Sequence, residues 1–252
     1  MIPTPSIPGL FITATSTGIG KTIITGAIVR WLRADGRRVA VCKPVATGCV
    51  RRREGLVSED AEYLAHCADT PHPLDLVCPV RYADPLAPAV AAERAKTPVD
   101  YEAIARSIRI MTADADVLLV EGIGGILVPL DGTHTVLDLA RDLNYPVVVV
   151  ADAGLGTINH TLLTLHALRA ADVPVAGVVI NRYPPGTPGL AEESNPRAIE
   201  KFGKVPILSI VPEDAIDMSP STGAPTPAAI ASAIAQADWW TLATRYWNKE
   251  EP

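Results

Sequence analysis

The stretch Thr13–Thr22, which reads TATSTGIGKT, decides the fold of this chain. An apolar run, Leu10–Ile12, precedes it, and a segment with helical character, Lys21–Ala34, follows it. A strand, a glycine-containing loop and a Lys-Thr pair that opens a helix form the geometry that holds a nucleotide's phosphates. The backbone N–H groups and the helix N-terminus face the anion, the lysine adds a positive charge, and the threonine hydroxyl can ligate Mg2+.

The stretch departs from the strict pattern G-x-x-x-x-G-K-[ST] at its first position, where this chain has Ala14. Alanine costs little there if its φ is negative, so we keep the phosphate-loop interpretation, although the match is less specific. The alternative is an ordinary glycine-rich turn between a strand and a helix.

The composition narrows the class of protein. The 252 residues are 48% apolar and 20% charged, which suits a globular α/β chain with a full core, and the net charge of −6 argues against a general nucleic-acid binder. The four cysteines form no C-x-x-C pair and the five histidines show no ligand spacing, so a structural zinc site is not expected. No apolar stretch approaches the length of a membrane span and no signal peptide is apparent, so we expect a cytoplasmic protein.

Apolar runs of four to six residues alternate with helical patterns, which predicts a mainly parallel sheet with crossover helices. After the first strand and helix, the expected strands are Arg38–Cys42, Val117–Val120, Pro146–Val150, Val175–Ile180 and Pro206–Val211. The expected helices are Glu59–Cys67, Ala87–Arg94, Asp100–Ala113, Thr135–Leu143, Asn159–Ala171, a short one at Pro196–Phe202, and a final one over about 228–247. A Pro/Gly-rich loop is expected before the short helix, and no linker is evident, so we expect one domain over residues 1–252.

Five buried runs each stop at a polar or special residue. They end at the phosphate loop, Lys43, Glu121, Asp152 and Asn181. Because the carboxyl ends of parallel strands emerge at one edge of a sheet, where ligands bind in such folds, these endings predict a single cleft.

Lys43 is the most informative of these endings. A second lysine aimed at the same edge as Lys21 suggests two anions, a triphosphate and an anionic acceptor, whereas the alternative is a surface lysine. Thr47 and Gly48, a few residues further on, would supply a hydroxyl and a close backbone approach.

Two carboxylates are candidates for holding a cation beside the triphosphate. Glu121 follows VLLV, as the acidic residue of a Walker-B-like strand does, and an unpaired carboxylate there would repel the nucleotide. The alternative is a solvated carboxylate at a strand end. Asp60 follows Ser58 in the first turn of an expected helix, where an acidic residue also favours the helix dipole without any ligand.

A second anion-ready helix start lies at Gly154–Asn159, where Gly-Leu-Gly-Thr precedes an expected helix. It suits a substrate carboxylate, or else Thr157 or Asn159 merely caps the helix. Asn181 suits a hydrogen bond to a purine edge, or else it is a turn-forming asparagine.

These segments together resemble the dethiobiotin synthetase family. The matching patterns are T-x-T-x-x-G-K-T at Thr15–Thr22, C-K-P-V-A-T-G at Cys42–Gly48, S-E-D-A at Ser58–Ala61, V-E-G-x-G-G at Val120–Gly125, and L-G-T-I-N-H at Leu155–His160, with Asn181 after them. They occur in the family's order and cover most of residues 10–212. The second and the last of these patterns are much more specific than the phosphate loop.

The resemblance implies a three-layer P-loop NTPase-like fold, a homodimer, and a cyclo-ligase of biotin biosynthesis. Diaminopelargonate (7,8-diaminononanoate) and CO2 would form a carbamate, ATP would phosphorylate it, and the neighbouring amine would close a cyclic urea. Two lysines and Mg2+ would offset the repulsion between the carbamate and the triphosphate.

The resemblance also implies roles for individual residues. Lys43 and Lys21 would be catalytic, and Thr22, Asp60 and Glu121 would hold Mg2+. The other nucleotide contacts would come from Thr17, Gly18, Ile19, Gly20, Ile23, Gly122, Gly124, Asn181, Arg182, Val211, Pro212 and Glu213. Substrate contacts would come from Thr47 and, across the dimer interface, from Gly156, Thr157 and Asn159.

Two departures from the family and three rival readings stay open. Ala14 replaces the usual first glycine of the phosphate loop, which would slightly reshape the loop. Gly18 stands where many family members have glutamate, which leaves the nucleotide preference open. The main rival is a P-loop partition or positioning ATPase, but that class has a lysine where this chain has Ser16, and often a basic amphipathic C-terminus, which this chain lacks. A cobyrinic-acid-type amide ligase would need a glutaminase domain for which there is no room. A non-enzymatic nucleotide-binding module does not account for two converging lysines.

Overall fold

In the computed structural model, which describes residues 2–53, 55–214 and 225–245, a parallel six-stranded sheet forms the centre of the molecule. Its strand order is β10-β9-β8-β1-β7-β2. The strands are β1 (Gly9–Ala14), β2 (Val39–Cys42), β7 (Val117–Gly125), β8 (Val147–Asp152), β9 (Val175–Tyr183) and β10 (Ile207–Pro212). Three of these strands, β1, β2 and β8, are buried along almost their whole length, as expected for strands covered on both faces.

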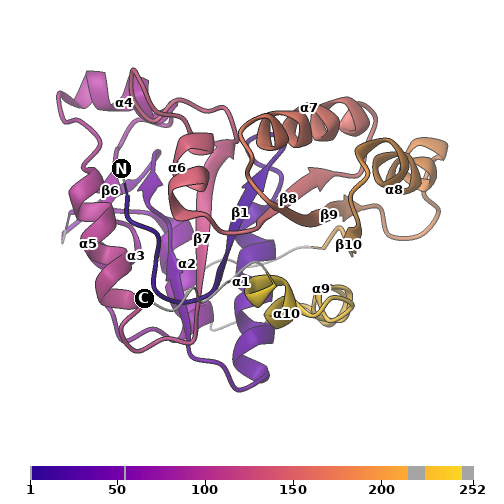
Figure 1. Cartoon of the computed structure of the whole chain (residues 1–252), viewed down its shortest axis with the longest axis horizontal. Coiled ribbons are helices and arrows are strands. Elements are labelled where there is room, and N and C mark those ends of the chain that lie inside the picture. Colours follow the sequence, from indigo (N-terminus) through magenta and orange to yellow (C-terminus); the bar gives the residue numbers. More distant parts are fainter. Residues whose placement is uncertain (1, 54, 215–224, 246–252) are drawn as a thin grey trace.

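Helices cover both faces of this sheet. They are α1 (Lys21–Ala34), α2 (Glu59–Ala68), α5 (Tyr101–Met111), α6 (Val136–Leu143), α7 (Thr157–Ala170), α8 (Leu190–Gly203), α9 (Ala228–Ile234) and α10 (Trp239–Thr244). Figure 1 shows α7 on one side of the sheet and α1, α9 and α10 on the other. The predicted α/β fold, mainly parallel and with helices on both faces, is therefore confirmed.

Local sequence signals explain where several helices begin. Ser58 accepts a hydrogen bond from the Ala61 N–H at 3.3 Å, so it caps α2 as predicted. Asp100 accepts one from the Ala103 N–H at 2.8 Å and starts α5 in the same way. At α6, Thr135 and Asp138 form a capping box.

The segment between β2 and β7 contains small elements that the hydrophobic pattern does not reveal. They are β3 (Val45–Ala46), which pairs with β6 (Val80–Arg81), the hairpin of β4 (Val50–Arg52) and β5 (Gly55–Val57), and α3 (Leu74–Val77). The strands among them are only two or three residues long, too short for an alternating pattern. In contrast, α4 (Pro88–Ala95) confirms the short helix predicted at Ala87–Arg94. This segment also fixes the backbone at Lys43, because the Lys43 N–H donates to the carbonyl of Val77 in α3 at 2.8 Å.

The predicted short helix at Pro196–Phe202 was wrong in length, because α8 begins at Leu190, within the expected loop. Two acidic residues, Glu192 and Glu193, lie in its first turn, where they favour the helix dipole, and Pro196 lies inside the helix. Proline is a poor guide to a boundary here, because Asn195 beside it is buried and its side chain is tied to the neighbouring Ala153 carbonyl.

The predicted single helix over 228–247 was also wrong, because the segment forms two helices, α9 and α10. Asp238 accepts a hydrogen bond from the Thr241 N–H at 2.9 Å and so starts a new helix. The indole N–H of the fully buried Trp239 donates to the Ile234 carbonyl at 2.7 Å and so joins the start of α10 to the end of α9. Trp247, which the expected helix included, lies outside the described residues.

The sheet brings the predicted strand ends to one edge. Cys42, which precedes Lys43, pairs with Val120, which precedes Glu121, and Asp152 pairs with Asn181. β1 lies between β7 and β8, so the phosphate loop emerges between these endings. Among the described residues, no helix combines the length and the apolar character that crossing a membrane requires.

Candidate active site

The phosphate loop connects β1 to α1 and is shaped by two glycines in the left-handed region. Gly18 has φ 75° and Gly20 has φ 86°. A Cβ on Gly20 would lie 2.4 Å from Nδ2 of Asn181, so this position has no room for a side chain. The same Asn181 amide donates to the Ile19 carbonyl at 2.7 Å. The end of β9 therefore holds the loop from beneath.

Lys21 and Thr22 open α1 and are both nearly buried, at 7% exposure each. Burial lowers the pKa of Lys21, and the charge of Lys43 lowers it further, although the carboxylates of Glu121 and Asp60 partly offset both effects. The Thr22 hydroxyl donates to Oε1 of Glu121 at 2.8 Å. The start of α1 is thus connected directly to the end of the VLLV run on β7.

Lys43 lies at the centre of the cluster. Its ammonium donates to Oδ2 of Asp60 at 2.6 Å and to Oε1 of Glu121 at 2.5 Å, and its side chain is 5% exposed. Burial alone would lower the pKa of Lys43, but the two carboxylates outweigh it and raise the pKa above the ordinary value. Burial would likewise raise the pKa of Asp60, but Lys43 outweighs it and lowers the pKa. Lys43 is therefore charged in this buried cluster, because the two carboxylates stabilise its ammonium group. A surface lysine would stay charged without such partners.

Glu121 is fully buried, and its two oxygens are in different situations. Oε1 accepts from both Thr22 and Lys43, whereas Oε2 has no hydrogen-bond partner among the described residues. A buried carboxylate oxygen without a partner is costly unless a ligand supplies one. Asp60, which shares Lys43 with Glu121, and the Thr22 hydroxyl, which donates to Oε1, are the further oxygen donors that could hold a divalent cation together with this carboxylate.

A cavity of about 390 Å3 opens over this cluster. Most of the predicted nucleotide contacts line it, together with the predicted substrate contact Thr47. The lining residues are Thr17, Gly18, Gly20, Lys21, Thr22, Ile23, Lys43, Thr47, Asp60, Ile123, Gly124 and Arg182. Ile123 was missed at the sequence level, because only the glycines around it belong to the pattern.

The other predicted nucleotide contacts do not line this cavity. Four of them, Ile19, Glu121, Gly122 and Asn181, are buried. A Cβ on Gly122 would meet Phe11 and Val136 at 3.1 to 3.2 Å, so this glycine serves the packing of β7. Val211, Pro212 and Glu213 lie at the end of β10. Of these, Val211 is fully buried, and the Glu213 N–H is bonded to the Tyr183 carbonyl at 2.7 Å.

The second predicted anion site lies at the start of α7, outside the cavity over Lys43. Gly156 has φ 93° and forms the N-cap, Thr157 is buried with no partner for its hydroxyl among the described residues, and Asn159 is exposed. A hollow of about 440 Å3 lies between the phosphate loop, the end of β7 and α7. Thr17 lines both this hollow and the cavity over Lys43, so the two spaces meet at the phosphate loop.

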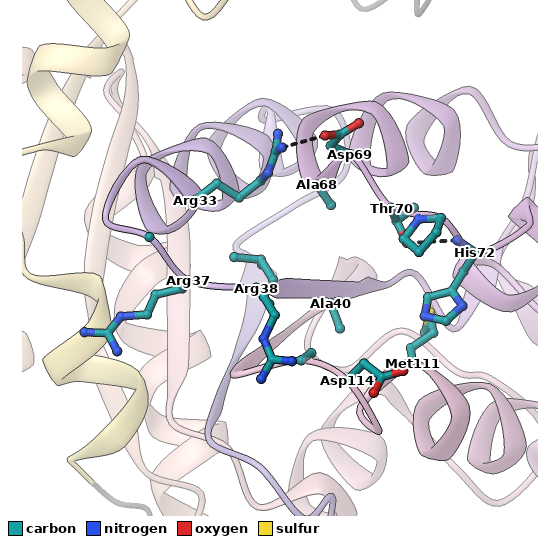
Figure 2. Close-up of a pocket in the computed structure, with 14 residues that line it drawn as sticks. Arg33, Arg37, Arg38, Ala40, Ala68, Asp69, Thr70, His72, Met111 and Asp114 are labelled. Atoms are coloured by element: carbon teal, nitrogen blue, oxygen red, sulfur yellow. Dashed lines mark hydrogen bonds and ion pairs between the residues drawn. The ribbon is translucent and has the colours of Figure 1, made fainter.

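A hollow at the opposite end of the sheet also contains cationic residues. It has a volume of about 460 Å3, and Figure 2 shows the arginines Arg33, Arg37 and Arg38 around it. Arg33 pairs with Asp69 at 2.8 Å and Arg38 with Asp116 at 2.7 Å. The Arg37 guanidinium lies 3.9 Å from the centre of the Trp240 ring. Since each of these cations already has a partner, this hollow is a poor candidate for an anion site.

Comparisons with known proteins point to one family. The chain is 40% identical to the "ATP-dependent dethiobiotin synthetase BioD" of Thermodesulfovibrio yellowstonii, over 81% of this chain and 88% of the relative. It is 44% identical to the protein of the same name from Anaeromyxobacter dehalogenans, over 70% of this chain and 78% of the relative. The protein of the same name from Nitrosospira multiformis is 39% identical, over 82% of this chain and 88% of the relative.

Two coarser comparisons agree on the fold. A family model described as an AAA domain matches residues 8–221. Among solved structures, the "MinC:MinD cell division protein complex" of Aquifex aeolicus superposes with a TM-score of 0.56, covering 97% of each chain at 16% identity. At that identity the likeness describes the arrangement of the elements and nothing about the reaction.

Proposed function

The chain belongs to the ATP-dependent dethiobiotin synthetase family, and from this premise we propose how its residues carry out the reaction. The enzyme is a cyclo-ligase of biotin biosynthesis that uses ATP to form dethiobiotin from 7,8-diaminononanoate (diaminopelargonate) and CO2. The observation that carries the proposal is the buried Lys43, held between Asp60 and Glu121 beside the phosphate loop.

The chemistry requires two anions to meet. One amine of diaminopelargonate adds CO2 to form a carbamate, whose oxygen attacks the γ-phosphorus of ATP, and ADP leaves. The second amine then attacks the carbonyl carbon of the mixed anhydride, phosphate leaves, and a cyclic urea results. The carbamate oxygen is already negative, so the phosphoryl step needs charge stabilisation and positioning more than a strong base.

We assign this stabilisation to Lys21 and Lys43. Lys21 neutralises the β- and γ-phosphates from the start of α1, as the lysine of a phosphate loop does. Lys43 approaches from the end of β2 and stabilises the carbamate and the transferring phosphoryl group. Two fixed and buried ammonium groups stabilise the developing charge more than they would in solution, because the local dielectric constant is low.

Mg2+ fits the residues Thr22, Asp60 and Glu121. The unpartnered Oε2 of Glu121 and the nearby Asp60 carboxylate are oxygen donors of the kind that this ion prefers, and the Thr22 hydroxyl completes a P-loop arrangement. When bound, the ion would neutralise charge on the β- and γ-phosphate oxygens. Lys43 already balances part of the charge of the two carboxylates, which keeps the pocket from repelling a triphosphate.

The nucleotide would lie along the loop and α1. Backbone N–H groups of the phosphate loop would receive the phosphates, with Thr17, Gly18, Gly20, Ile23 and Gly124 forming the walls that contact them. We place the base towards Asn181, Arg182 and the Val211–Glu213 segment. In this chain Asn181 donates its amide N–H to the Ile19 carbonyl, so its contribution to base recognition would come from its side-chain carbonyl oxygen.

The substrate would bind on the other side of the loop. Thr47 lines the cavity over Lys43 and would contact the diamine end. For the carboxylate end we propose Gly156, Thr157 and Asn159 at the start of α7, supported by the unpartnered hydroxyl of Thr157. We also propose that the enzyme is a homodimer, with this second site contributed across the interface. The exposed Leu155 and Leu163 on either side of it suit burial by a partner subunit.

Product formation tests the proposal directly. Purified protein incubated with diaminopelargonate, bicarbonate, Mg2+ and ATP should form dethiobiotin and release one phosphate for each ring closed. Phosphate release that does not depend on diaminopelargonate, without dethiobiotin, would instead favour a positioning-type ATPase switch. The identity to synthetases over most of the chain counts against that alternative.

A further inference from the structure

Arg182 forms an unusual contact with the phosphate loop. Its guanidinium Nη2 donates to the Gly18 carbonyl at 2.5 Å, and its own backbone is left-handed, with φ 59°. That conformation is unfavourable for a residue that has a Cβ and persists where the surroundings impose it, often at functional sites. The end of β9 is therefore held in a strained shape that directs an arginine at the loop.

Asp152 lies beside Arg182 on the neighbouring strand, and its two carboxylate oxygens make different contacts. In the β8–β9 register Asp152 pairs with Asn181, the residue before Arg182. Its Oδ2 lies 3.9 Å from Nη1 of Arg182, and its Oδ1 accepts from the Gly154 N–H at 3.0 Å. One carboxylate thus touches both the arginine that holds the phosphate loop and the turn that opens α7.

The turn before α7 has a second support on its far side. The buried Asn195 of α8 donates its amide to the Ala153 carbonyl at 2.7 Å and to the Gly154 carbonyl at 3.1 Å. Between these supports, the position of Gly154 and hence of the Gly156 N-cap depends on Asp152. A continuous series of contacts therefore runs from Gly18 through Arg182 and Asp152 to Gly154.

We infer that Arg182 and Asp152 are a positioning pair that couples the nucleotide site to the carboxylate site at the start of α7. A nucleotide that orders the phosphate loop would fix the Gly18 carbonyl, and through this pair it would fix the turn that receives the substrate. The conformational entropy lost when the loop and the turn become ordered is then lost once for both ligands. Each ligand therefore tightens the binding of the other by the same factor. The inference rests on the proposed function, because it takes the start of α7 as the substrate carboxylate site.

The pair offers two variants that separate coupling from direct contact. Asp152→Asn keeps an oxygen that can accept from the Gly154 N–H but loses the charge that faces Arg182. Arg182→Ala removes the contact with Gly18 and any direct contact with the nucleotide. Arg38→Gln is the matched control, since it removes an exposed arginine–aspartate pair at the other end of the sheet.

The experiment measures the dissociation constant of diaminopelargonate by calorimetry, without nucleotide and with a saturating non-hydrolysable ATP analogue plus Mg2+. The wild type should bind the substrate more tightly with the analogue. We expect Asp152→Asn and Arg182→Ala each to reduce this gain by about threefold, as for an exposed charge pair, and the double variant to reduce it no further. Asp152→Asn should leave the affinity for the analogue alone unchanged, and Arg38→Gln should keep the full gain.

Three results would overturn the coupling. They are a wild type that shows no gain, variants that keep the wild-type gain, and a double variant that loses the product of the two single effects. Dethiobiotin formation by the wild type, measured in parallel, distinguishes this failure from that of the proposed function. An enzyme that forms dethiobiotin but shows no coupling refutes only the positioning pair. An enzyme that forms none refutes the function on which it rests.

Discussion

The two ends of the central sheet both carry cations near a hollow, but the cations differ in how they are satisfied. At the carboxyl ends of the strands, Lys21 and Lys43 are 7% and 4% exposed. At the opposite end, the side chains of Arg33 and Arg38 are 37% and 67% exposed, and each pairs with one aspartate. Water screens the exposed pairs, so their net contribution is small.

The lysine end is, in contrast, incomplete. Oε1 of Glu121 has two donors while Oε2 has none among the described residues, and Lys43 is shared between two carboxylates. Taking these charges out of water is costly, and their mutual attraction only partly repays that cost. Burial together with an unsatisfied group, and not the number of charges, marks the end of the sheet where a ligand completes the structure.

The largest expected effect comes from removing the charge at the centre of the lysine end. Lys43→Ala should lower kcat by about 100-fold or more, because a fixed charge on the transferring phosphoryl group is lost, and change ATP affinity by only about threefold. Steady-state kinetics of dethiobiotin formation and calorimetric titration with ATP would measure the two quantities.

This variant also leaves Glu121 buried without its cation, which is destabilising. Lys43→Gln, which keeps a long polar side chain, therefore serves as the companion variant, and thermal unfolding of both shows whether the protein is folded. Near-normal turnover in a folded variant would sink the assignment of Lys43.

The next effect tests the unpartnered oxygen. Glu121→Gln keeps the shape of the side chain and an acceptor for Thr22, but it removes the negative charge that a cation needs. We expect the Mg2+ concentration for half-maximal activity to rise by about tenfold or more. Titration of activity with Mg2+ at saturating ATP measures it. An unchanged requirement would mean that Glu121 serves only to hold Lys43 and Thr22.

A third effect follows from the opposite pKa shifts of the two lysines. Burial lowers the pKa of Lys21 below 10.5, whereas the carboxylates raise that of Lys43. ATP favours the protonated Lys21, so ATP affinity should be constant below the pKa of the free enzyme and fall by about tenfold per pH unit above it. The fall should begin below pH 10.5, while Lys43 keeps its proton.

Calorimetric titration with ATP across this range checks the expectation. In Lys21→Arg the guanidinium stays protonated, so the alkaline fall should disappear from the range even if the affinity itself is lower. A wild type whose affinity stays flat up to pH 10.5 would contradict the lowered pKa.

The lysine end was largely predictable from sequence because its residues follow strands. Lys43, Glu121 and Asn181 each come directly after a buried apolar run, and a parallel sheet brings such residues to one edge whatever its exact register. The order of the strands did not enter that argument. The prediction of the cluster therefore needed only the class of the fold.

What could not be predicted depends on contacts between distant segments. The Asn181 amide bonds the Ile19 carbonyl across the sheet, and Asn195 makes α8 longer than the pattern around Pro196 indicates. The break between α9 and α10 depends on the indole of Trp239. Such contacts have no local period, so neither hydrophobic spacing nor turn chemistry reveals them.

The smallest effect is expected at the arginine end, and it completes the comparison. Arg38→Ala removes an ion pair with Asp116 that is well aligned but whose arginine is two-thirds exposed. The free energy of unfolding should fall only slightly, and the loss should shrink further as salt is added, because the pair is screened. Chemical denaturation at low and high ionic strength measures the loss, while kcat and both KM values should match the wild type. A loss of dethiobiotin formation in this folded variant would show that the paired arginines also serve the reaction, and the contrast between the two ends would fail.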